Sequence, residues 1–492
     1  MTKLPNTTAD QLEQVLTAAA AAAPAVAAAL PAERAAWIFA AADSLDAAAD
    51  RLVPLAVEES ALPEQRLRGE IARSSGQLRL FAEALAEGAL HEPIIDTADP
   101  DAEPIPRPDL RRMLVPLGPV LVFAASNFPF AFSVCGGDTA SALAAGCPVL
   151  VKSHPGHPRL SEAVAEVMVT ALREAGAPEG TLAVVHGDRV GVEALGDPRI
   201  KASGFTGSVA GGLALHEVAA NRPDPIPFYG ELGSLNPAFV LTGALEERRS
   251  EIAAGFVASY TLGVGQFCTK PGLLLLPTGH GLEKEIVAAA EDVAAAPMLN
   301  ERIHQGYTAG LARLRARDGL EALVTGDESE GGVSASLFKT TVPRLIEDAA
   351  ELLEECFGPT SIVVEYADDD ELYAAASLFR GNLTATVHGS DDDADVAARL
   401  LPLLEGRAGR VVWNGWPTGV AVSWAMQHGG PFPATVGSIH TSVGTTAARR
   451  FQRPVCFQNI PGGLLPELLR DRNSLNVSRR VNGEITRRDI TS

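Results

Sequence analysis

The chain has 492 residues, about three times the length of a typical domain of roughly 150 residues, so two or three domains are expected. Hydrophobic residues make up 46% and charged residues 21% of the chain, which is typical of folded globular proteins and unlike disordered or disulfide-stabilised chains. The 40 Lys and Arg against 61 Asp and Glu give a net charge of −21. This charge repels phosphate backbones and anionic lipid, so neither nucleic acid nor a membrane surface is expected as a partner.

The cysteines and the N-terminal region indicate a cytoplasmic protein. The chain has 5 cysteines, scattered and without a CxxC pair: Cys135, Cys147, Cys268, Cys356 and Cys456. Such an odd set predicts neither a disulfide framework nor a zinc site, and it suits a reducing compartment. The apolar run over residues 18–29 is almost entirely Ala, contains Pro24 and is shorter than the ~20 residues that a membrane span needs. We expect a surface helix there and no targeting segment.

The first half of the chain predicts helices followed by a parallel sheet. Residues 9–88 show the spacing of amphipathic helices, interrupted by Pro24, Pro31, Pro54 and Pro63. The proline-rich stretch 91–110 predicts an extended connection. Strands are predicted over 120–125, 147–152, 181–187 and 200–208, with a helix over 160–176. This βαβ alternation predicts a parallel, doubly wound sheet.

The second half repeats the alternation and predicts a second α/β domain. Strands are expected over 236–243, 272–277, 361–366 and 410–415, and helices over 283–296 and 343–356. The break between the domains is expected near residues 230–233, where glycines and a proline-rich stretch interrupt both periodicities. The end of the chain is predicted to be either a strand-bearing tail or a frayed end.

Three residues are candidates for chemistry. Cys268 lies in a loop flanked by Gly263 and Gly265, where backbone N–H groups can face a developing oxyanion. Glu231 lies in a glycine-lined turn beside apolar residues, where burial is expected to raise its pKa toward that of a general base. Asn127 follows a strand, so its amide can donate to an oxyanion. Each residue also has a simpler interpretation when it is taken singly. Cys268 can be a buried thiol, Glu231 a carboxylate on a surface turn, and Asn127 a turn cap.

Six ordered motifs make the chain resemble the aldehyde dehydrogenase superfamily. They are SNFPF at 126–130, VK at 151–152, FTGS at 205–208, ELG at 231–233, GQFC at 265–268 and ECFGP at 355–359. The resemblance implies an aldehyde dehydrogenase-like α/β fold with two doubly wound domains and a small β oligomerisation element. It implies a cofactor-binding domain over 1–104 and 120–230, a catalytic domain over 231–430, and an oligomerisation hairpin and tail over 105–119 and 431–492. Homodimers or homotetramers are expected.

The resemblance also implies roles for individual residues. The Cys268 thiolate would attack an aldehyde, the Asn127 amide and the Cys268 N–H would hold the oxyanion, and water activated by Glu231 would hydrolyse the thioester. Residues implied in cofactor binding are Lys152 at the adenosine ribose, Gly207 and Ser208 at the pyrophosphate, Glu355 at the nicotinamide ribose and Phe357 near the nicotinamide ring. No metal site is expected.

One departure from the family pattern bears on the cofactor. NAD-preferring relatives often carry Glu three positions after the lysine, whereas the sequence here runs Lys152-Ser153-His154-Pro155. Without that carboxylate, Lys152, Ser153 and His154 can hold a 2′-phosphate, with Arg189 as a further cation. We therefore expect NADP to be used at least as well as NAD.

Further motifs resemble the branch containing NADP-dependent 2-oxoglutarate semialdehyde (2,5-dioxopentanoate) dehydrogenases. They are KSHPGHP, GQFCTKPG, HGGPFPAT and RRFQRPVCFQNIP, although VGSIH at 436–440 replaces a run in which relatives carry Asp and Arg. Oxidation of 2-oxoglutarate semialdehyde to 2-oxoglutarate is the expected reaction. Alternatives are a broad-specificity NADP-dependent dehydrogenase of fatty aldehydes or other semialdehydes, a CoA-acylating relative, which Glu231 disfavours, and a catalytically silent homologue.

Overall fold

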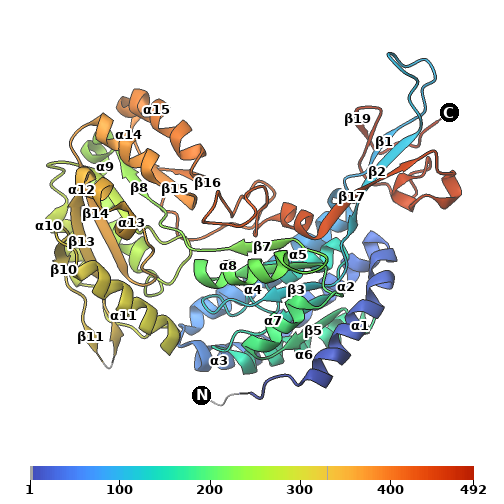
Figure 1. The fold of residues 1–492 in the computed structure, drawn as a ribbon, viewed down its shortest axis with the longest axis horizontal. Coiled ribbons are helices and arrows are strands. Elements are labelled where there is room, and N and C mark those ends of the chain that lie inside the picture. The colour runs from blue at the N-terminus through green and yellow to red at the C-terminus, as the bar shows by residue number, and fades with distance from the viewer. Residues whose placement is uncertain (1–3, 330, 492) are drawn as a thin grey trace.

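The computed structural model describes residues 4–329 and 331–491. Three sheets organise the chain: two α/β units face each other, and a small sheet projects from one end (Figure 1). No helix within the described ranges is both long enough and apolar enough to cross a membrane.

The first α/β unit is built on a five-stranded parallel sheet in the order β5-β4-β3-β6-β7. Its strands are β3 (Val120–Phe123), β4 (Val149–Lys152), β5 (Leu182–Val185), β6 (Ala202–Thr206) and β7 (Phe228–Glu231). Its helices are α1 (Ala9–Ala28), α2 (Pro31–Ala47), α3 (Ala49–Ser60), α4 (Glu64–Ala86), α5 (Gly137–Ala145), α6 (Pro158–Glu174), α7 (Asp188–Gly196) and α8 (Val209–Ala220), with the short η1 (Ala89–His91). The expected parallel sheet is confirmed.

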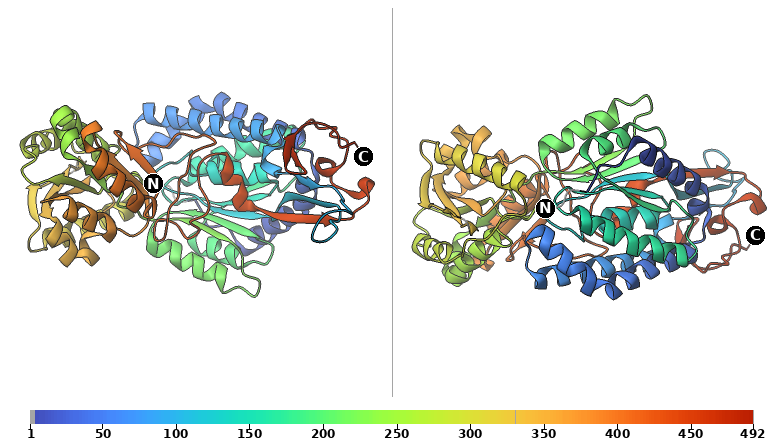
Figure 2. Two further views of the ribbon diagram at one scale, coloured as in Figure 1. Left: turned by 90° about the horizontal axis from the view of Figure 1, so that it is seen from above. Right: turned by 90° about the horizontal axis from the view of Figure 1, so that it is seen from below.

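Alternating side chains of this sheet enter two separate cores. Val120 and Val122 pack with residues of α2 to α6, whereas Leu121 and Phe123 pack with residues of α1 and α7. Successive strand residues point to opposite faces, so an unbroken apolar run is needed where helices cover both. Figure 2 shows the lighter blue helices α2 to α4 on one side of the sheet, and green α8 with dark-blue α1 on the other.

The second α/β unit has a seven-stranded sheet in the order β10-β13-β14-β9-β8-β15-β16. Its strands are β8 (Ala238–Val240), β9 (Leu273–Pro277), β10 (Glu321–Val324), β13 (Ser336–Thr341), β14 (Thr360–Tyr366), β15 (Asn382–His388) and β16 (Ala408–Trp413). Only the edge strand β10 runs antiparallel to its neighbour. Helices α9 (Thr242–Thr261), α10 (Glu283–Glu291), α11 (Glu301–Arg315), α12 (Val342–Glu347), α13 (Ala349–Leu352), α14 (Asp369–Leu378) and α15 (Ala394–Glu405) accompany it, with η2 (Asp391–Asp393) and the hairpin β11 (Glu328–Ser329) and β12 (Gly332–Val333).

The projecting sheet joins segments from both ends of the chain. Its order is β17-β2-β1-β18-β19, from β1 (Ile94–Asp96), β2 (Leu110–Pro116), β17 (Gln452–Gln458), β18 (Arg479–Val481) and β19 (Glu484–Thr486). The tail also forms the short helices η3 (Thr445–Phe451), η4 (Gly462–Leu464) and η5 (Glu467–Leu469). The tail thus bears strands. The projecting sheet differs from the expected boundaries in two places. Its strand β1 lies ahead of residue 105, and residues 434–436 pair with the end of β7 in the first sheet instead.

Two details of the helix prediction are wrong. Pro24 and Pro54 lie inside α1 and α3, because tertiary packing outweighs the single hydrogen bond that each proline removes. Residues 343–356 do not form one helix: α12 and α13 are separated at Asp348, and a loop follows from residue 353. That loop carries Glu355 and Phe357, so the break positions two residues of the expected cofactor site.

Candidate active site

The loop that carries Cys268 begins with a left-handed turn after α9. Gly263, Val264 and Gly265 have φ values of 58°, 61° and 63°, and such a conformation is unusual for a β-branched residue such as Val264. A Cβ at Gly265 would lie 2.2 Å from the Gly358 carbonyl oxygen, so glycine is required for this close approach. The turn brings the Cys268 loop against the loop that carries Glu355 and Phe357.

Asn236 anchors the other side of the Cys268 loop. It is fully buried, and its Nδ2 donates to the carbonyl oxygens of Cys268 and Lys270, both at 2.9 Å. Its Oδ1 accepts from Ser234 and from the backbone and hydroxyl of Thr384 on β15. The central strands of the second sheet therefore fix the backbone on both sides of the thiol.

Cys268 meets Glu231 and His428, and the three side chains come from distant parts of the chain. Cys268 Sγ lies 3.5 Å from His428 Nε2, which lies 3.0 Å from Glu231 Oε1. Ser442 Oγ donates to Glu231 Oε2 at 2.5 Å, and the His428 backbone N–H donates to Thr441 Oγ1 at 2.8 Å. Glu231 and His428 are 3% and 1% exposed. This buried Cys–His–Glu cluster can move a proton from a thiol.

The electrostatics of this cluster differ from the expectation for Glu231. Burial would raise its pKa, but the charge and hydrogen bond of His428, with the hydrogen bond of Ser442, lower the pKa of Glu231 below its ordinary value. The expected rise is therefore wrong, because it ignored an imidazole that lies 197 residues further along the chain. Burial, followed by the charge of Glu231, raises the pKa of the Cys268 thiol well above its ordinary value. A neighbouring base is thus needed to form the thiolate.

Sequence reasoning missed His428 as a site residue. It lies in a coil segment of the tail, between β16 and η3, where no helical or strand periodicity marks it. The HGGPFPAT motif contains it, so the motif held the signal although its histidine was not singled out. Donor atoms of Glu231, Cys268 and His428 lie within 4.8 Å of one another, and such a set can also ligate zinc. Their hydrogen bonds with each other and with Ser442 explain the arrangement without an ion.

Asn127 lies beside the Cys268 loop. Its Nδ2 donates to the Gln266 carbonyl oxygen at 3.1 Å, and its own carbonyl oxygen accepts from Arg66 at 2.6 Å. A carboxamide carries a second N–H, so one donor remains for a ligand at the thiol. The structure therefore brings Asn127, Glu231 and Cys268 to one place.

The residues expected at the adenosine ribose lie where β4 ends and α7 begins, a place called the adenosine corner below. Lys152 Nζ is paired with Asp188, at the first position of α7. Ser153 Oγ is hydrogen-bonded to His186 Nδ1 at 2.7 Å, so this hydroxyl is directed into the protein. His154 stacks on His157 at 5.6 Å, and burial lowers its pKa well below the ordinary range, so it is a neutral donor. Arg189 is 90% exposed and pairs with Glu193, which directs it away from this corner.

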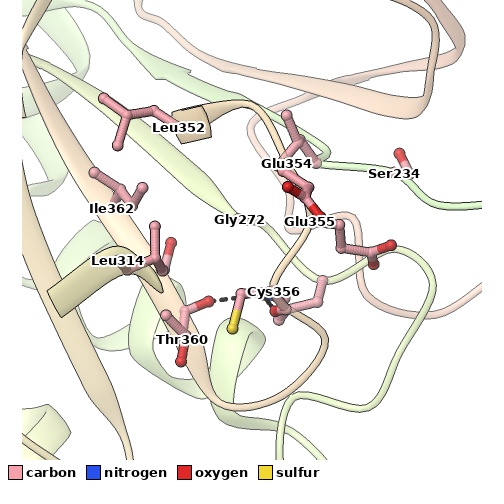
Figure 3. Close-up of a pocket in the computed structure, with 12 residues that line it drawn as sticks. Ser234, Gly272, Leu314, Leu352, Glu354, Glu355, Cys356, Thr360 and Ile362 are labelled. Carbon is pink, nitrogen blue, oxygen red and sulfur yellow. Dashed lines mark hydrogen bonds between the residues drawn. The ribbon is translucent and has the colours of Figure 1, made fainter. Parts of the chain in front are cut away.

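The remaining expected cofactor residues occupy two loops. Gly207 and Ser208 precede α8, and Ser208 caps it by accepting from the Gly211 N–H at 3.3 Å. A helix N-terminus after a parallel strand suits a pyrophosphate. Glu355 and Phe357 lie on the loop before β14, and Glu355 lies near the Ser234 segment (Figure 3). Burial raises the pKa of Glu355 to about 7.

Lys270 connects the Cys268 loop to the Glu355 loop. Its buried Nζ donates to the carbonyl oxygens of Cys356 and Thr360 at 3.0 and 2.6 Å. Both loops line the small pocket drawn in Figure 3. Lys270 therefore ties the Glu355 loop to the loop that carries the thiol.

Sequence comparison finds a family and two similar relatives. The aldehyde dehydrogenase family model matches residues 1–446. An alpha-ketoglutaric semialdehyde dehydrogenase of Acinetobacter baylyi is 43% identical over 97% of this chain and 92% of its own. Alpha-ketoglutaric semialdehyde dehydrogenase 2 of Azospirillum brasilense is 45% identical over 92% of this chain and 87% of its own.

Solved structures share the fold. An NAD-dependent aldehyde dehydrogenase from Sinorhizobium meliloti matches with a TM-score of 0.76 and 24% identity, over 93% of this chain and 89% of that chain. Aldehyde dehydrogenase 21 from Physcomitrella patens, solved with the product succinate, matches with a TM-score of 0.78 and 21% identity, over 94% and 92% of the two chains. At these identities the likeness shows the fold alone.

Proposed function

The chain belongs to the aldehyde dehydrogenase family, an NAD(P)-dependent class of oxidoreductases, and we propose that it oxidises 2-oxoglutarate semialdehyde to 2-oxoglutarate with Cys268 as nucleophile. The observation that carries the proposal is the buried cluster in which Cys268 Sγ lies 3.5 Å from His428 Nε2, itself 3.0 Å from Glu231. The two relatives of 43% and 45% identity, both named as dehydrogenases of this semialdehyde, support the choice of substrate.

The first half of the proposed reaction forms a bond between Cys268 and the substrate. The thiol proton passes to the His428–Glu231 pair, and the imidazolium balances the thiolate formed beside it. Sγ then attacks the aldehyde carbon, and the carbonyl electrons move to its oxygen. The free N–H of Asn127 and the Cys268 backbone N–H hold this oxyanion, as in other acyl-transfer sites. The bound nicotinamide ring supplies the acceptor for the hydride that leaves the carbon, which makes the product a Cys268 thioester.

The second half of the proposed reaction releases the acid. After the proton taken from the thiol has passed to solvent, the Glu231–His428 pair takes a proton from a water molecule, and the hydroxide attacks the thioester carbon. The C–S bond breaks, and the thiolate returns to Cys268. Because His428 and Ser442 hold both carboxylate oxygens of Glu231, the base is fixed in place during both halves.

Charge at the adenosine corner supports the use of NADP at least as well as NAD. Its carboxylate, Asp188, is already paired with Lys152. Arg302, near the start of α11, lies close enough that its charge lowers the pKa of both Asp188 and His154. Lys152 and Arg302 thus bring two cations to this corner, and cations favour a 2′-phosphate. Arg302→Gln should therefore lower kcat/KM for NADP and leave that for NAD within about twofold.

The test of the proposed function is a substrate panel run with both cofactors. We expect kcat/KM for 2-oxoglutarate semialdehyde to exceed those for succinate semialdehyde and a long-chain aldehyde, and we expect Cys268→Ala to abolish oxidation while it retains cofactor binding. A preference for the long-chain aldehyde would support a broad-specificity fatty-aldehyde dehydrogenase instead. Absence of turnover with every aldehyde would support a catalytically silent homologue. A marked NAD preference would contradict the cofactor proposal.

We propose that the first α/β unit binds the cofactor and that the second carries the catalytic cysteine. We also propose that homo-oligomers form through the projecting sheet. Both edge strands of that sheet, β17 and β19, are unpaired on their outer sides within the described chain. Open edges pair readily with a symmetry-related copy. Light scattering should give a dimer or a tetramer. Cys456, at β17, is exposed and all five cysteines are free, which suits the reducing cytoplasm proposed for the enzyme.

A further inference from the structure

Helix α4 presents charged side chains to the active site at helical spacing. Arg66, Glu70 and Arg73 are four and then three residues apart, so they share one face of the helix. Glu70 is 5% exposed and accepts from the N–H groups of Phe130 and Ala131 at 2.8 and 3.0 Å. This face of α4 is therefore attached to the loop that carries Asn127.

Arg73 lies close to the reacting thiol. Its guanidinium carbon lies 5.6 Å from the centre of the Phe132 ring, which lies 6.4 Å from the centre of the His428 ring. The charges of Cys268 and Glu231 both act on Arg73, and Arg73 in turn acts to lower the pKa of Cys268. Arg73 is therefore part of the surroundings of the catalytic cluster.

The guanidinium of Arg73 has no hydrogen-bond or ion-pair partner among residues 4–329 and 331–491. The arginines on the outer side of the same helix differ: Arg68 pairs with Asp50 and Glu64, and Arg79 pairs with Asp43 and Asp46. A half-buried cation is costly unless it is paired. The missing partner of Arg73 is therefore expected to be an anion that arrives with the substrate.

Two other arginines near the thiol have hydrogen-bond partners in the protein, although Nη1 of Arg66 and Nε of Arg410 are buried without one. Arg66 donates to the Asn127 carbonyl oxygen at 2.6 Å and lies over the rings of Phe128 and Phe267 at 5.1 and 4.8 Å. Arg410 donates to the carbonyl oxygens of Pro417 and Gly419. Arg66 and Arg73 against Glu70 give this face a net positive charge.

We infer that Arg73 binds the distal carboxylate of the substrate and thereby selects carboxylate-bearing aldehydes; this inference rests on the proposed function. In 2-oxoglutarate semialdehyde four C–C bonds of about 1.5 Å separate the two terminal carbons, an extended length of roughly 5 Å. A charge-assisted N–H···O bond adds about 2.8 Å. A substrate that is bonded to Sγ and extends along Phe132 would direct its carboxylate toward the guanidinium, since Phe132 lies between Arg73 and His428 in the chain of contacts.

The test compares carboxylate and neutral aldehydes in three proteins: the wild type, Arg73→Gln, and the matched control Arg68→Gln on the outer side of α4. A hydrogen bond to a charged group contributes about 1.5–3 kcal/mol, or roughly a 10- to 150-fold change in binding. We expect Arg73→Gln to lower kcat/KM for succinate semialdehyde and 2-oxoglutarate semialdehyde by that factor, mostly through KM. The kcat/KM for butanal, which matches succinate semialdehyde in carbon number, should fall by a smaller factor, because only the effect of the Arg73 charge on Cys268 is then lost. Arg68→Gln should change neither substrate. Arg73→Lys should restore part of the loss.

A second measurement keeps the inference separate from the proposed function. Glutarate should inhibit butanal oxidation competitively in the wild type, and Arg73→Gln should weaken that inhibition at least ~10-fold. If the wild type prefers butanal to 2-oxoglutarate semialdehyde while glutarate inhibition still depends on Arg73, the proposed substrate is wrong and the carboxylate site stands. If the wild type prefers the semialdehyde and Arg73→Gln keeps that preference, or loses activity equally with butanal, the inference is overturned.

Discussion

Replacing His428 by Asn should slow formation of the thioester more than any other single change outside Cys268. The His428 imidazole lies between the thiol at 3.5 Å and the Glu231 carboxylate at 3.0 Å. Asn supplies a donor of similar size but cannot accept and carry a proton at neutral pH. The thiol, whose pKa burial and Glu231 raise, then loses one of its two neighbouring proton acceptors, and Glu231 remains.

The size of the effect follows from two losses. General-base transfer contributes about 10²- to 10⁴-fold, so the rate of the first turnover should fall at least ~100-fold. Removing one partner of a buried hydrogen bond costs about 1–3 kcal/mol, and the Asn amide should recover part of this. The pKa of Glu231, which His428 now holds below its ordinary value, should rise.

The assay is the pre-steady-state burst of reduced cofactor, together with the pH dependence of Cys268 alkylation by iodoacetamide. In His428→Asn the burst should be slow, and alkylation should require a higher pH than in the wild type. His440→Asn is the matched control, because His440 lies in the same segment but packs edge-on against Tyr229. A burst in His428→Asn within about threefold of the wild-type rate would show that His428 is not the proton acceptor.

Two further predictions concern the cofactor loop and the catalytic turn. Burial raises the pKa of Glu355 to about 7, and its ionised form accepts more hydrogen bonds from ribose hydroxyls. The cofactor KM of the wild type should therefore fall as the pH rises from 6 to 8. In Glu355→Gln the cofactor KM should not change with pH. A flat wild-type profile would contradict this role. Gly265→Ala should lower the free energy of unfolding far more than Gly279→Ala. Both residues have positive φ, and this left-handed strain alone costs about 1–2 kcal/mol. Only at Gly265 does the new Cβ also meet a carbonyl oxygen, at 2.2 Å. Urea unfolding measures the difference, and equal losses would show that the loop yields to the new methyl group.

The continuous apolar runs explain why the sheets could be predicted from sequence. Residues 120–123 and 273–276 are apolar at every position because helices cover both faces of their sheets. Pro24 and Pro54 misled because proline usually ends a helix, whereas here packing along the rest of each helix keeps it intact. Sequence-based rules for helix ends therefore fail where tertiary packing outweighs the local preference of a residue.

Active-site residues could be predicted only where the neighbouring sequence marks them. Cys268 and Glu231 each stand among glycines, whereas His428 lies in irregular chain and gains its role from contacts across 160 and 197 residues. The same distance explains the wrong direction for the pKa of Glu231. Ser153 and Arg189 show what the sequence could not supply: it places both where a phosphate can bind, but it does not reveal their pairing with His186 and Glu193.

The most direct measurement of the reaction is mass spectrometry of Glu231→Gln quenched after it is mixed with the semialdehyde and cofactor. This variant keeps the nucleophile but lacks the carboxylate that we assign to water activation, so the acyl enzyme should accumulate after one burst of reduced cofactor. We expect the added acyl mass on the peptide that contains Cys268 and on no peptide containing the other four cysteines. An adduct at another residue, or full steady-state turnover without any adduct, would contradict covalent catalysis at Cys268.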